Sequence, residues 1–152
     1  RPGARAAGPG AGRRPRGGSG LDFHLGNKLT EIGSGAWDTV VMHGFSLLDA
    51  GKPRDPAKLI AISKQVAEFL RGKKAKAELF LISTWARADN VYQPKGAWAG
   101  QTIETMTRDV RAAYDQAAKG AGITTVIPVG ESWLRAMQMT WAPRRASTRM
   151  VS

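Results

Sequence analysis

The segment DPAKLIAISKQVAEFLRG, residues 55–72, and the segment ELFLIST, residues 78–84, decide the fold. In the first segment, Asp55 suits the N-cap of a helix, Pro56 suits its first position, and Gly72 suits its end. Between them, apolar residues keep to one helical face: Leu59, Ile62, Val66, Phe69 and Leu70. The second segment is apolar at successive positions, as in a strand that is buried on both faces. Together they predict an amphipathic helix followed by a buried strand.

The same alternation is predicted on both sides of this unit. TVVM, residues 39–42, and the apolar run at residues 123–129 are each typical of a buried strand. Between the second and third strands, Thr102 suits the cap of another amphipathic helix, which Gly120 and Gly122 would end. Its apolar residues recur at helical spacing: Ile103, Met106, Val110, Tyr114 and Ala117.

Two shorter helices and one long loop complete the prediction. A helix interrupted at Gly26 is expected over residues 21–32, and a polar loop is expected over residues 87–100. A final short helix follows the third strand. Its apolar stripe is expected to place two tryptophans in the core: Trp133 and Trp141.

Buried strands that alternate with amphipathic helices imply right-handed crossovers and a parallel sheet. We therefore predict an α/β fold, a three-layer α/β/α sandwich with helices on both sides of the sheet. Only three strands are expected, whereas sheets of this class usually contain five or six. The domain is therefore expected to be partial.

The charge of the chain is concentrated at its ends. The net charge is +11, but residues 1–20 contain five Arg and residues 143–152 contain three, with no acidic residue in either, which leaves +3 for residues 21–142. We expect disordered basic tails at residues 1–16 and 143–152 that flank one domain at 17–142. Binding to nucleic acid or to an acidic surface would have to reside in these tails, and is the alternative function.

Several classes of site are excluded by composition. The chain contains no Cys, so disulfides and thiolate ligands are excluded, and its two His residues lack metal-ligand spacing. No metal or cofactor is therefore expected. No apolar run approaches the ~20 residues of a membrane span, and no signal peptide is recognised, so the compartment stays open.

The predicted strand ends locate the candidate site. Ligands of open parallel sheets bind beyond the carboxyl ends of the strands. That rule selects residues 43–46, 85–89 and 130–133, which should open on one edge of the sheet.

Four motifs follow one another along the chain: GGSGLDFHL (17–25), WDTVVMHGFS (37–46), LFLISTWARAD (79–89) and VIPVGESWLRAM (126–137). In this order they resemble the SGNH (GDSL-type) hydrolase superfamily, and in particular bacterial branches with "TWAR" and "PVGEAW" motifs. The resemblance implies a flavodoxin-like three-layer fold and hydrolysis of a small or carbohydrate ester by a Ser nucleophile, a His base and an orienting Asp. Backbone and side-chain donors would stabilise the oxyanion.

The resemblance assigns roles to only some residues of this chain. Gly18 matches the Gly whose amide faces the oxyanion, and His43 stands where relatives carry a Gln or Asn donor. Trp85 and Arg87 match "TWAR" and are implied to contact substrate. We add three substrate-binding candidates near the strand ends: Ser46, Asp89 and Trp98, the last of which is expected near solvent or ligand.

Some of these candidates, and Glu131 at the start of the last predicted helix, also have an ordinary structural explanation. His43 and Ser46 stand three apart and would form a substitute dyad only if the turn aimed one at the other; otherwise Ser46 caps the turn. Arg87 and Asp89 would otherwise be an exposed ion pair. Glu131 at a helix start is favoured by the helix dipole whatever its function.

Two blocks of the family are not found in this sequence. No Gly-Asp-Ser or Gly-Asn-Ser block stands before Gly18, and residues 140–152 contain neither Asp nor His. We therefore expect an incomplete and inactive copy of an ester hydrolase. Its expected partner is a small ester, and its unfinished sheet is expected to favour self-association.

Overall fold

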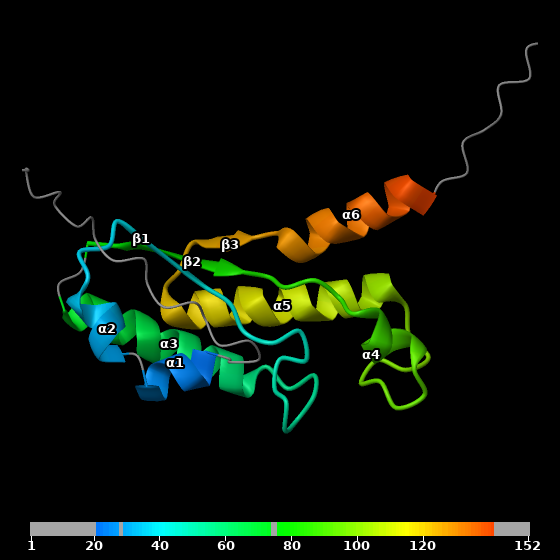
Figure 1. Ribbon diagram of the computed structural model, residues 1–152, viewed down its shortest axis with the longest axis horizontal. Coiled ribbons are helices and arrows are strands. Elements are labelled where there is room, and N and C mark those ends of the chain that lie inside the picture. Colours follow the sequence, from blue (N-terminus) through cyan, green and yellow to red (C-terminus); the bar gives the residue numbers. More distant parts are fainter. Residues whose placement is uncertain (1–20, 28, 74–75, 142–152) are drawn as a thin grey trace, which may run out of the picture.

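The computed structural model describes residues 21–27, 29–73 and 76–141 (Figure 1). The expected basic tails at residues 1–16 and 143–152, and the expected oxyanion donor Gly18, lie outside the described residues.

The described residues form helices and strands in regular alternation. In chain order these are α1 (Leu21–Asn27), α2 (Leu29–Ser34), β1 (Thr39–Met42), α3 (Ala57–Gly72), β2 (Glu78–Ile82), α4 (Ala88–Tyr92), α5 (Ile103–Ala121), β3 (Thr125–Ile127) and α6 (Val129–Trp141). The three strands are parallel in the order β1-β2-β3, with Val41 opposite Phe80 and Leu81 opposite Val126. The predicted α/β class is confirmed as a three-stranded parallel sheet flanked by helices, which is consistent with a partial domain.

The core lies between one face of the sheet and the two long helices. Helices α1, α2, α3 and α5 lie on the same side of the sheet, whereas α6 leaves the carboxyl end of β3 and extends beyond it (Figure 1). Met42 and Leu81 are buried on the helix side of the sheet, where they join Val66 and Leu70 of α3 and Val110 of α5 in one apolar cluster. Because the three strands are parallel, their carboxyl ends lie at the same edge of the sheet.

The opposite face of the sheet is partly open. Val41 in the middle of β1 is 47% exposed, and the first residue of each strand is exposed as well. The prediction that residues 39–42 are buried on both faces is therefore wrong. Its physical reason is that successive strand residues point to opposite faces, and the long described helices cover only one of them.

The two long helices begin and end where the sequence predicts. At the start of α3, the Asp55 carboxylate accepts a hydrogen bond from the Ala57 N–H at 2.9 Å. At the start of α5, the Thr102 hydroxyl accepts one from the Thr105 N–H at 3.1 Å, and Gly122 ends the helix in the left-handed region with φ 62°. None of the helices in the described part of the chain combines the length and apolar content needed to span a bilayer.

Candidate functional site

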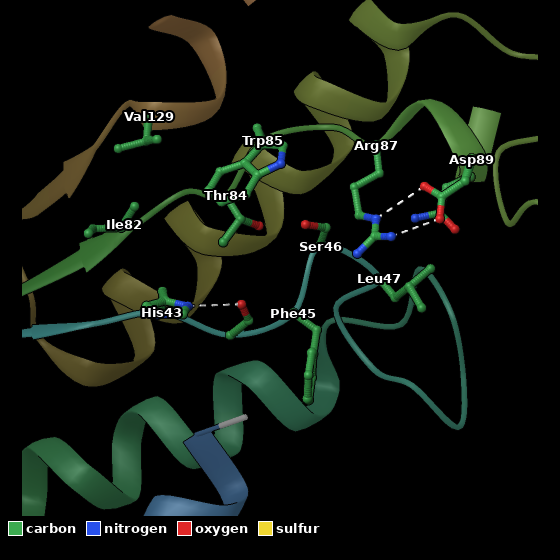
Figure 2. Close-up of a pocket in the computed structure, with 12 residues that line it drawn as sticks. His43, Phe45, Ser46, Leu47, Ile82, Thr84, Trp85, Arg87, Asp89 and Val129 are labelled. Atoms are coloured by element: carbon green, nitrogen blue, oxygen red, sulfur yellow. Dashed lines mark hydrogen bonds and ion pairs between the residues drawn. The ribbon is translucent and has the colours of Figure 1, made fainter. Parts of the chain in front are cut away.

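A pocket of about 670 Å³ opens at the carboxyl ends of the parallel strands (Figure 2). This volume falls within the range of small-molecule sites, roughly 300–1,000 Å³. It is formed by the loop after β1, the end of β2 with the segment leading into α4, and the start of α6. Its lining residues are His43, Gly44, Phe45, Ser46, Leu47, Ile82, Thr84, Trp85, Arg87, Asp89, Asn90 and Val129. The rule for strand ends selected seven of these twelve residues, whereas none of residues 130–133, which it also selected, lines the pocket.

A buried tyrosine holds the loop after β1 in place. The Gly44 N–H donates a hydrogen bond to the phenol oxygen of Tyr114 at 2.7 Å, and Tyr114 is completely buried in α5. Burial raises the pKa of Tyr114, so the phenol stays neutral. The hydrogen bond from the Gly44 N–H opposes this pKa shift in part. Tyr114 therefore links α5 to the pocket loop.

The rest of this loop contains two unusual backbone conformations and is held by buried apolar packing and backbone hydrogen bonds. Leu48 has φ 70° and Arg54 has φ 74°, which costs a non-glycine residue roughly 1 kcal/mol or more. The Leu48 side chain is buried, and its N–H donates to the Phe45 carbonyl at 3.0 Å. The Arg54 N–H donates to the Leu47 carbonyl at 2.9 Å. These contacts offset the energetic cost of the two unusual backbone conformations.

The structure does not assemble His43 and Ser46 into a dyad. The His43 Nδ1 lies 3.3 Å from the carbonyl oxygen of Gly44 and points toward it, and no hydrogen bond joins His43 to Ser46 among the described residues (Figure 2). Because a carbonyl only accepts, Nδ1 would be the donor in any hydrogen bond across this contact. Ser46 lines the pocket beside it.

Trp85, Arg87 and Asp89 form the other wall of the pocket. Trp85 is 47% exposed. The Arg87 guanidinium donates two hydrogen bonds to the Asp89 carboxylate, from Nε at 3.1 Å and from Nη2 at 2.9 Å (Figure 2). The hydrogen bond from Arg87 lowers the pKa of Asp89, and Asp89 raises the pKa of Arg87. Arg87 and Asp89 thus form the ion pair that was their structural explanation, and both side chains also line the pocket.

The expectation that Trp98 lies near solvent or ligand is wrong. Its side chain is 0% exposed and is not part of the pocket lining. The indole Nε1 donates to Asp109 of α5 at 2.8 Å, and the Arg54 guanidinium lies 5.3 Å from the ring centroid. The expected polar loop also contains a helix that was not predicted, α4. Trp98 therefore anchors this segment to α5.

A polar network that was not predicted joins β2, α5 and α6 next to the pocket. The buried Ser83 hydroxyl donates to Glu131 Oε2 at 3.0 Å, and Arg111 Nη1 donates to Glu131 Oε1 at 2.6 Å. Arg111 also pairs with Asp115 at 2.8 Å. Burial on its own raises the pKa of Glu131, but the hydrogen bonds, those from Arg111 foremost, outweigh it and lower the pKa. Glu131 thus links the start of α6 to β2 and α5 through hydrogen bonds, whereas the sequence had suggested only its favourable place at a helix start.

The start of α6 is packed directly against the end of β2. A Cβ on Gly130 would lie 2.6 Å from the Thr84 carbonyl oxygen, and the Gly130 N–H donates to the Ser83 carbonyl at 3.0 Å. The expectation of Trp133 in the core is wrong, because it is 53% exposed. Its ring contacts Trp85, with centroids 6.4 Å apart and planes tilted by 44°. The side chain of Trp141 lies outside the described residues.

Within the described ranges, no three carboxylate or imidazole side chains gather closely enough to hold a metal ion. The functional groups that line the pocket are two hydroxyls, one imidazole, one indole, one carboxamide and one ion pair, set among apolar side chains.

One comparison with known proteins found a similar structure. No protein-family model matches the chain, and no curated protein matches it. A solved structure described as "a putative SGNH hydrolase from Slackia heliotrinireducens" is similar to it, with a TM-score of 0.59 and 25% sequence identity. The similarity covers 80% of this chain, which spans only 65% of that protein. This similarity supports placing the chain in the SGNH hydrolase superfamily.

Proposed function

We propose that this chain is an SGNH-type ester hydrolase domain that carries the ester-binding wall of the site and lacks its nucleophile. The observation that carries the proposal is the pocket at the carboxyl ends of β1 and β2, which contains His43, Trp85 and Arg87 together. These are the positions that the family motifs relate to the substrate or the oxyanion. The similarity to a solved structure of the same superfamily supports the proposal.

The chemistry of the lining supports ester binding rather than turnover. The pocket provides apolar surface beside a small number of polar groups, which is the usual composition of a site for a small organic molecule. A Ser nucleophile needs a base within hydrogen-bond reach and a third group that orients the base. Among the described residues, Ser46 has no such hydrogen bond to His43, whose Nδ1 lies near the Gly44 carbonyl oxygen instead.

Ester binding is tested by a nuclear magnetic resonance titration of the full chain with phenyl acetate. The amide signals of residues 43–47 and 84–90 are expected to shift, because these segments line the pocket. Trp85→Ala should weaken binding by about fivefold, as expected for loss of roughly 1 kcal/mol of aromatic contact. Tyr92→Ala is the matched control, since Tyr92 is an aromatic residue of the adjacent helix α4, is 68% exposed and does not line the pocket. Shifts that avoid both segments, or equal losses in the two variants, would contradict the proposal.

The missing nucleophile is tested with p-nitrophenyl acetate. Wild type, Ser46→Ala and His43→Ala are expected to release p-nitrophenol at the same low rate, because no described pair of residues activates a hydroxyl. A rate in the wild type that Ser46→Ala abolishes would show that the chain carries its own nucleophile. That result would overturn the inactive part of the proposal and leave the ester-binding part standing.

A further inference from the structure

The charges in the pocket are arranged so that they cancel. Arg87 and Asp89 carry the fixed charges of the lining, and each satisfies the other through two hydrogen bonds at 2.9 and 3.1 Å. This bidentate geometry uses the Nε/Nη2 edge of the guanidinium, and the Asp89 carboxylate balances its charge. The pocket therefore contains an arginine whose charge is already balanced, in a protein whose net charge of +11 would otherwise attract anions at long range.

The remaining walls favour apolar groups. Leu47, Ile82, Trp85 and Val129 surround the space in front of the ion pair (Figure 2). Each Å² of apolar ligand surface that they remove from water contributes about 25 cal/mol. A ligand carboxylate would lose part of its hydration here without gaining an unpaired cation, and a ligand ammonium would meet a carboxylate that is already paired.

We propose that the pocket selects an uncharged ester with an apolar body and discriminates against the corresponding carboxylate. This inference rests on the function proposed above and adds the class of ester. Asp89 is a specificity-determining residue in this view, because it balances the charge of Arg87 and uses one edge of its guanidinium, which weakens the attraction for anions. Removing the Asp89 carboxylate while keeping its shape should turn the pocket into an anion site.

The test uses two probes that differ in charge: methyl 1-naphthylacetate and 1-naphthylacetate, each titrated at pH 7.5 and followed by amide shifts. Wild type is expected to bind the ester about tenfold more tightly than the anion, because the anion is desolvated without a free partner. In Asp89→Asn, the anion should gain about fivefold, the effect of one ion pair near the surface, whereas the ester should change by less than about twofold.

The control removes the same charge elsewhere. Glu68→Gln, in the exposed Lys64–Glu68 pair on α3 (N···O 3.8 Å), raises the net charge by one without touching the pocket lining. It should leave the preference between the two probes unchanged. Equal affinity of wild type for both probes, or an equal gain of anion binding in Asp89→Asn and Glu68→Gln, would overturn the inference while ester binding stands. Failure of both probes to shift the pocket amides would overturn the proposed function together with it.

Discussion

Replacement of Glu131 by Gln tests the network that holds α6 against β2 and α5. The Glu131 carboxylate receives hydrogen bonds from Arg111 at 2.6 Å and from Ser83 at 3.0 Å. A glutamine can keep its carbonyl oxygen toward Arg111 and turn its amide toward the Ser83 oxygen, so the variant loses the charge rather than both contacts. Hydrogen bonds to charged groups contribute about 1.5–3 kcal/mol and neutral ones about 0.5–1.5 kcal/mol. The expected loss in the free energy of unfolding is therefore about 1 kcal/mol.

The matched control for this substitution is the second carboxylate on the same arginine. Asp115 also pairs with Arg111, but its side chain is 52% exposed against 26% for Glu131. Because exposed pairs on a helix contribute about 0.3–0.5 kcal/mol, Asp115→Asn should cost less than half as much as Glu131→Gln. Urea denaturation at pH 7, followed by far-ultraviolet circular dichroism, measures both differences.

The lowered pKa of Glu131 predicts how its contribution to the free energy of unfolding changes with pH. The pKa of Glu131 is lowered in the folded chain, so the folded state binds fewer protons than the unfolded one through this group. Its contribution is then fully present above the unfolded pKa of about 4.3 and is lost as the pH falls through the folded pKa. The difference between wild type and Glu131→Gln should shrink accordingly below about pH 4. A loss equal to that of Asp115→Asn, or one that persists unchanged in acid, would refute this account of the network.

Two further predictions follow from the described contacts. Tyr114→Phe removes the acceptor of the Gly44 N–H and should lower the free energy of unfolding by about 1–2 kcal/mol. Amide hydrogen exchange should become faster mainly at residues 43–48. An equal increase along the whole chain would contradict a local role for the phenol. The outer edges of β1 and β3 pair with no other described strand, and Val41 is half exposed. Size-exclusion chromatography should therefore show self-association that increases with protein concentration and weakens in Val41→Lys. A monomer at all concentrations would refute this prediction.

Local sequence patterns were sufficient for the strands and the two long helices that build the pocket, but not for α4. The capping residues Asp55 and Thr102, the helical spacing of apolar residues, and Gly122 at a left-handed C-cap depend on neighbours in the chain, so they could be interpreted without the fold. The rule for strand ends then placed His43, Ser46 and Trp85 on one edge, because parallel strands end at the same side of a sheet. The lining of the pocket was predictable to that extent.

Tertiary structure decided which side chains face that pocket and which do not. Trp98 stands in a polar segment, yet Asp109 and Arg54 supply a partner for its indole N–H and a cation over its ring, and both come from other parts of the chain. Trp133 has core-like spacing, yet it is exposed, because α6 extends beyond the sheet and meets Trp85 instead.

The sequence by itself determined an α/β chain of parallel strands and the edge at which its site lies, since both follow from periodicity and capping over a few residues. Only the folded chain determined that Arg87 is occupied by Asp89, that Tyr114 holds the loop at Gly44, and that Glu131 links β2 to α5 through Ser83 and Arg111. The Tyr114 and Glu131 contacts join residues far apart in the sequence, and the Arg87–Asp89 pair depends on how the backbone turns into α4. The strength of each depends on burial and direction, which spacing along a sequence does not encode.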